Sequence, residues 1–95
     1  METEKIRALL TAADLGSFSK AADALGYTQS GITHMMNALE EELGVPLLVR
    51  GNRGVRLSSD GERLEPQLRR LVSEAERLEQ ELALTRGVES GLVRI

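Results

Sequence analysis

The sequence contains no cysteine and no tryptophan, and it has only one phenylalanine and one tyrosine in 95 residues. The absence of cysteine excludes a disulfide scaffold, a thiolate zinc site and a cysteine nucleophile, and it fits a reducing compartment. With so few aromatic rings, the core must be built from Leu, Val, Ile, Met and Ala. A chain of this length corresponds to one small domain, or to a small domain with an appendage.

The sequence also lacks the patterns of a membrane protein or an enzyme. No uncharged stretch approaches the ~20 apolar residues that a membrane span needs, and no apolar signal core follows Glu2, Glu4 and Lys5. The single histidine, His34, has no charge-relay partner nearby in sequence, and no metal-ligand spacing occurs. We therefore expect a cytoplasmic protein without catalytic residues, metal, cofactor or membrane partner.

An excess of positive charge is missing as well. The formal net charge is −3, and residues 1–57 hold six Lys or Arg against seven Asp or Glu. Nucleic-acid-binding proteins are usually basic, with cations gathered on one face. A DNA-binding hypothesis must therefore rest on the local placement of charge.

Apolar residues at helical spacing predict three short helices in the first half of the chain. Three glycines act as their C-terminal stops, Gly16, Gly26 and Gly44. Either Ser17 or Ser19 can cap the second helix, and Thr28 can cap the third, which covers residues 28–43. The very short turn between the second and third helices indicates a helix-turn-helix. Any small three-helix core with tight turns is the alternative.

One face of the third helix is polar and uncharged over its N-terminal half. At about 3.6 residues per turn, this face gathers Ser30, Thr33, His34 and Asn37. The C-terminal end is acidic through residues 40–42, so only the N-terminal half can approach phosphates. A recognition helix docks on DNA with the same polarity. An ordinary solvated helix face is the alternative.

Two short apolar runs on either side of residues 51–54 predict a β-hairpin after Pro46. The hairpin carries the densest cationic stretch of the chain, Arg50, Arg53 and Arg56. Arginines on a hairpin can enter a minor groove or bind phosphates. The alternative is an edge hairpin whose charges prevent strand addition.

A fourth helix of nearly thirty residues is predicted over 59–86, beginning after Ser58 or Ser59. Its apolar residues recur in alternating steps of four and three, a heptad pattern formed by Leu64, Leu68, Leu71, Ala75, Leu78 and Leu82. This pattern predicts homodimerisation through the helix, with packing inside the same chain as the alternative. Gly87 and Gly91 predict a flexible break before a strand that opens at residues 92–95.

A more specific pattern is carried by particular residues along the chain. They are Gly16-Ser17-Phe18-Ser19-Lys20-Ala21-Ala22, Leu25, Gln29-Ser30, Ile32-Thr33, Leu39-Glu40-Glu41-Glu42-Leu43-Gly44, Gly54-Val55-Arg56-Leu57 and Gly61-Glu62-Arg63-Leu64. In combination they resemble the N-terminal module of LysR-type transcriptional regulators. The resemblance covers the whole chain and implies a mainly α fold. A winged helix-turn-helix, three helices plus a two-stranded β-hairpin wing, would span residues 1–58. A long linker and dimerisation helix would follow over residues 59–86.

The resemblance also implies partners. Residues 87–95 would form a hinge and the start of a missing effector-binding domain, so a small-molecule effector would bind only there. The module would bind double-stranded DNA as a homodimer on an inverted-repeat operator. The residues that match DNA-binding positions of the family are Lys20, Thr28, Gln29, Ser30, Thr33, His34, Arg50 and Arg53. Asn37 joins them through the shared helix face.

Two departures from the family pattern bear on which half-site is bound. Ser30 stands where the family often has Pro, and His34 stands where it very often has Arg. Histidine lacks the bidentate fork of arginine. Two hypotheses follow. In the first, the chain is a sequence-specific DNA-binding module, with residues 28–43 in the major groove and the wing on the minor groove or the DNA backbone. In the second, it is a protein-interaction module that dimerises without reading DNA sequence. Net acidity and His34 favour the second, and the arginines of the hairpin favour the first.

Overall fold

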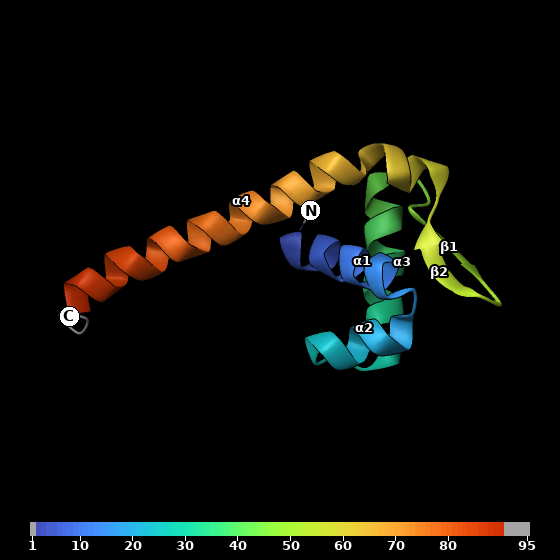
Figure 1. The fold of residues 1–95 in the computed structure, drawn as a ribbon, viewed down its shortest axis with the longest axis horizontal. Coiled ribbons are helices and arrows are strands. Elements are labelled where there is room, and N and C mark those ends of the chain that lie inside the picture. Colours follow the sequence, from blue (N-terminus) through green and yellow to red (C-terminus); the bar gives the residue numbers. More distant parts are fainter. Residues whose placement is uncertain (1, 91–95) are drawn as a thin grey trace.

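A computed structural model describes residues 2–90, which form four helices and one β-hairpin (Figure 1). The helices are α1 (Thr3–Leu15), α2 (Phe18–Leu25), α3 (Gln29–Leu43) and α4 (Ser59–Ser90), and the strands are β1 (Leu48–Gly51) and β2 (Gly54–Leu57). The first three helices and the hairpin form a small globular body, and α4 extends far beyond it, giving overall dimensions of 52 × 26 × 20 Å. This arrangement confirms the predicted winged helix-turn-helix with a long following helix.

Local capping sets the helix ends. Ser17 is the N-cap of α2, because its Oγ accepts the Lys20 backbone N–H at 3.1 Å, whereas Ser19 lies inside the helix. Thr28 caps α3 in the same way, its Oγ1 accepting the Gly31 N–H at 3.0 Å. The glycines that follow the first three helices have φ between 70° and 80°, a left-handed conformation that side chains disfavour.

The core is aliphatic, as the composition predicts. Its largest fully buried side chains come from α1, α3 and the segment before β1, and they are Ile6, Leu9, Ile32, Met36, Leu39 and Leu47. The first turns of α4 belong to the same core through Leu68 and Val72. The base of α4 is therefore part of the globular body.

The hairpin is antiparallel, with Leu48 opposite Leu57 and Gly51 opposite Gly54. The backbone N–H of Val55 donates to the carbonyl oxygen of Gly16 at 3.1 Å, which joins the hairpin to the turn between α1 and α2. Gly54 has φ +105°, and a Cβ there would overlap with the Gly16 carbonyl. Only glycine allows the hairpin to lie this close to the helices.

Ser58 fixes the start of α4. Its Oγ donates to the Pro46 carbonyl at 2.7 Å and accepts the Gly61 N–H at 3.0 Å. Gly61 is buried, and a Cβ there would overlap with the carbonyl of Leu47. The first turn of α4 thus packs directly on the chain that leads into the hairpin.

Two predictions about α4 need correction. The helix does not end at residue 86, because Gly87 keeps a helical backbone and α4 continues to Ser90. A glycine inside a helix costs about 1 kcal/mol, which does not by itself end the helix. The heptad pattern is also divided: Leu68 is buried in the chain's own core and Leu64 packs against it, so the alternative of packing within the chain holds for this part. The strand predicted at residues 92–95 lies outside the described residues.

No helix among the described residues is long and apolar enough to cross a membrane.

Candidate nucleic-acid interface

A shallow hollow on α3 gathers the polar residues predicted for the recognition face. It is lined by Gln29, Ser30, Thr33, His34 and Asn37. No acidic residue lines it. In Figure 1 the N-terminal end of α3 lies beside α2, and its C-terminal end lies beneath α4. The uncharged N-terminal half of α3 therefore lies away from α4, where a partner can reach it.

Two hydroxyl groups near the start of α3 are held by the backbone. Thr28 Oγ1 accepts the Gly31 N–H and lies 3.4 Å from Ser30 Oγ. Thr33 Oγ1 donates to the Gln29 carbonyl at 3.0 Å. Thr33 therefore offers a methyl group and an acceptor oxygen to a partner, and Thr28 keeps a hydroxyl hydrogen that can be donated to a phosphate. The free N–H groups of the first helical turn add positive potential at this end.

The wing presents arginine at its turn. A second hollow runs along the hairpin and is lined by Val49 and residues 51–56. Arg53 lies in the turn between the strands, and both Arg53 and Arg56 are exposed. No ion pair involves either side chain within residues 2–90, so both charges are available to phosphates. Lys20 is likewise exposed, in the first turn of α2.

Arg50 behaves differently from the other arginines of the hairpin. Its Nη2 donates to Asn37 Oδ1 at 2.8 Å, and its guanidinium carbon lies 4.9 Å from the centroid of the Phe18 ring. The structure therefore separates Arg50 from Arg53 and brings it to α3. Sequence reasoning missed this contact, because nothing in the residues between positions 37 and 50 specifies how the hairpin leans on the helix.

One carboxylate at the acidic end of α3 has a structural role. Glu40 was expected only to repel phosphates, but its Oε2 accepts the backbone N–H groups of Leu47 at 2.7 Å and Leu48 at 2.9 Å. The carboxylate thus satisfies two donors at the start of the wing. The sequence carries no local signal for this role, since the partners lie seven and eight residues away across a turn.

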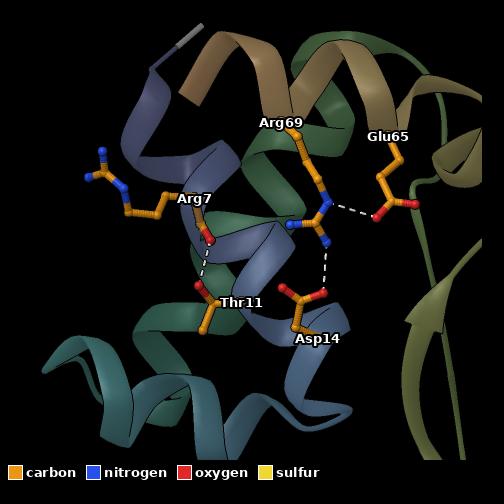
Figure 2. Close-up of polar contacts among 5 residues, drawn as sticks. All are labelled: Arg7, Thr11, Asp14, Glu65 and Arg69. Atoms are coloured by element: carbon orange, nitrogen blue, oxygen red, sulfur yellow. Dashed lines mark hydrogen bonds and ion pairs between the residues drawn. The ribbon is translucent and has the colours of Figure 1, made fainter. Parts of the chain in front are cut away.

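Ion pairs on the other side of the domain hold α4 against α1 (Figure 2). Arg69 donates from Nη2 to Asp14 Oδ1 at 2.7 Å and from Nε to Glu65 Oε2 at 2.8 Å. Hydrogen bonding to Asp14, and then to Glu65, raises the pKa of Arg69. About two helical turns further along both helices, Arg7 pairs with Glu76 at 3.6 Å. The Arg69–Asp14 and Arg7–Glu76 pairs join α4 to α1, and neither was predicted.

The described residues contain no group of three or more His, Cys, Asp or Glu side chains placed to hold a metal ion.

Known proteins resemble this chain in both sequence and structure. A family profile described as "Bacterial regulatory helix-turn-helix protein, lysR family" matches residues 3–62. The uncharacterized HTH-type transcriptional regulator YvbU of Bacillus subtilis (strain 168) is 33% identical over 96 residues, which cover 100% of this chain and 33% of that protein. The chain thus spans about a third of the length of this relative.

Two solved structures with DNA have the same fold. The crystal structure of the CbnR_DBD-DNA complex matches with a TM-score of 0.79 and 32% identity, over 90% of this chain and 99% of that chain. The BenM_DBD/catB site 1 DNA complex matches with a TM-score of 0.77 and 33% identity, over 96% of this chain and 95% of that chain.

Proposed function

Because this chain belongs to the LysR family of bacterial regulatory helix-turn-helix proteins, we propose that it binds DNA sequence-specifically, as a homodimer, within a longer transcriptional regulator. It is a DNA-binding domain of a transcription regulator and not an enzyme. The observation that carries the finer proposal is the exposed, acid-free hollow on α3, which lies in the same domain as an arginine-bearing wing.

The N-terminal half of α3 enters the major groove in this proposal. The side chains that reach base edges are those that line the hollow, Gln29, Ser30, Thr33, His34 and Asn37. Their donors and acceptors complement those that base pairs offer in the major groove. Thr28, Lys20 and the first N–H groups of α3 contact phosphates. The acidic C-terminal end of α3 is repelled by the DNA phosphates, and this repulsion sets the orientation of the helix on DNA.

The wing supplies positive charge to a chain whose net charge is negative. Arg53 sits at the tip of the hairpin, without an ion-pair partner within residues 2–90, and contacts the minor groove or the phosphates. With so few free cations on one copy, binding by a single domain is weak. Two linked copies raise the affinity, because the second contact forms at a high effective concentration.

Dimerisation is assigned to the outer part of α4. Leu71, Leu78 and Leu82 stay on one side of the helix with 40%, 60% and 45% of their surface exposed. An apolar groove at the base of α4, lined by Leu43, Val45, Leu64, Leu68 and Leu71, adjoins the same stripe. A second copy of α4 that covers these leucines removes apolar area from water at about 25 cal/mol per Å². The two recognition helices would then match an inverted repeat.

The protein that contains this module acts, in this proposal, in the cytoplasm and binds a small-molecule effector through a separate domain. The chain spans about a third of YvbU, which leaves room for such a domain in a longer protein.

The test is a binding titration of the 95-residue chain with DNA from upstream of its own gene. Fluorescence anisotropy compares this DNA with a shuffled duplex of the same base composition at the same salt concentration. Preference for the upstream DNA that disappears on shuffling supports the proposal. Equal affinity for both duplexes would contradict it.

A second candidate, a protein-interaction module that dimerises without reading DNA sequence, is favoured by the net charge of −3 and by His34, which lacks the bidentate fork of arginine. The same titration separates the two functions. A stable dimer that shows no preference for any duplex would support the second candidate.

A further inference from the structure

A hydrogen bond between Arg50 of the wing and Asn37 of α3 determines which atoms Asn37 can offer to DNA. Arg50 Nη2 lies 2.8 Å from the side-chain amide of Asn37. A guanidinium group has only donors, so the atom of Asn37 that faces it must be the carbonyl oxygen. The orientation of the Asn37 amide is therefore fixed by chemistry, and its NH2 group is the part left for other partners.

Arg50 is itself held in place. Its guanidinium carbon lies 4.9 Å from the centroid of the Phe18 ring, and Phe18 is buried at the start of α2. The backbone of Arg50 belongs to β1, where it pairs with Val55. The side chain is thus bounded by α2 on one side and α3 on the other, and it restrains Asn37 before any DNA is bound.

Asn37 belongs to the recognition face. It is exposed and lines the same hollow as Gln29, Ser30, Thr33 and His34. An unrestrained asparagine prefers adenine, because its oxygen accepts from the adenine N6 amino group while its nitrogen donates to N7. With its oxygen bonded to Arg50, Asn37 presents its NH2 group to DNA and no longer makes that two-bond pairing. Its donors suit the carbonyl oxygens of the keto bases, O6 of guanine and O4 of thymine, whereas adenine offers N7 alone beside its own N6 donor.

We propose that Arg50 is a positioning residue that makes Asn37 a hydrogen-bond donor toward DNA, so that one position of each half-site prefers a keto base over adenine. This inference rests on the proposed sequence-specific binding and assigns the base class at one position. Arg50 acts through Asn37 and needs no base contact of its own. Arg53 at the wing tip contributes charge instead.

The experiment is a selection of binding sites from randomised duplexes, carried out with the whole 95-residue chain and four variants. For the wild type we expect one position in each half-site at which a keto base is preferred over adenine by at least about fivefold, and Asn37→Ala should abolish the preference at that position alone. Arg50→Met keeps a long apolar stem against Phe18 but removes all donors. It should move the preference at this position toward adenine.

Two further variants complete the design. Arg53→Met loses the same charge from the same hairpin and should lower the affinity for all sequences without moving the preference. Asn37→Asp keeps an acceptor for Arg50 but has no donor, so it should turn the position away from keto bases. Because Asn37→Asp leaves the wing contact intact, it tests the proposal even where Arg50→Met fails to fold, which circular dichroism would reveal.

The outcomes separate the two levels of the proposal. A wild type that selects no consensus overturns the proposed function itself. A wild type that selects a consensus with adenine at the position sensitive to Asn37→Ala overturns the inference about Arg50 alone. The inference also fails if Arg50→Met folds and retains the wild-type preference, or if no position responds to Asn37→Ala.

Discussion

The carboxylate of Glu40 accepts the backbone N–H of Leu47 at 2.7 Å, and this bond joins the last turn of the recognition helix to the chain entering the wing. Leu47 is fully buried, so its N–H has no access to water. Together with the Arg50–Asn37 hydrogen bond, the Glu40 carboxylate therefore links α3 to the hairpin.

Replacing Glu40 with Ala should lower the free energy of unfolding by about 2–3 kcal/mol, because a buried donor is left without a partner and hydrogen bonds to a charged group are lost. Urea unfolding followed by circular dichroism measures the change. Glu41→Ala is the matched control, since Glu41 is exposed and should change stability by less than about 0.5 kcal/mol. Equal effects of the two substitutions would show that the Glu40 bonds contribute little.

Gly61→Ala should destabilise the domain by about 1–3 kcal/mol although alanine favours helices, because the added Cβ overlaps with the Leu47 carbonyl. Gly51→Ala provides the control, since a Cβ at Gly51 meets no atom within 4 Å. Thermal unfolding of both variants makes the comparison. If Gly61→Ala were as stable as the wild type, α4 could not pack against the loop as closely as described.

Leu78→Glu should dissociate the proposed dimer, because it places a charge in the exposed leucine stripe of α4. Leu84→Glu is the control: Leu84 is 65% exposed but lies outside the heptad positions. Sedimentation velocity at micromolar concentration should show a monomer for the first variant and a dimer for the second. The same dimer in both variants would place the interface elsewhere.

Arg53→Ala should weaken binding to all duplexes and reduce the slope of log affinity against log salt by about 1 per copy, as expected for the loss of one phosphate contact. His34→Ala should leave the salt slope unchanged and alter base preference within the half-site, because His34 lines the α3 hollow. Titrations at four or more salt concentrations distinguish the two. A smaller slope for His34→Ala than for Arg53→Ala would mean that the roles are reversed.

The parts of the fold that follow from local chemistry could be predicted from the sequence. The glycines that stop the helices and the hydroxyl caps Ser17 and Thr28 depend on residues within four positions of one another. The polar face of α3 follows from helical spacing over residues 29–37. The cap at Ser17 was one of two predicted alternatives. Only the structure, through the Lys20 N–H, selects it.

The parts that could not be predicted depend on contacts between distant segments. Arg50 pairs with a residue 13 positions away, and Arg69 pairs with Asp14, 55 positions away. A heptad pattern shows which residues share a helix face but not which surface covers that face. The heptad pattern therefore predicts that Leu68 contacts a second copy, although Leu68 is buried in its own chain. It gives no sign that Val72 belongs to the same core.

The burial of Leu68 and Val72, together with the ion pairs of Arg69 and Arg7, makes α4 a stiff extension of the DNA-binding body rather than a tether. Cutting the chain after residue 58 would remove Leu68 and Val72 from the core and should lower the stability of the domain. In a dimer joined through this helix, the distance between the two recognition helices is set by the point at which the two α4 helices cross. In the proposed dimer, helix packing far from the DNA would set the spacing of the operator half-sites.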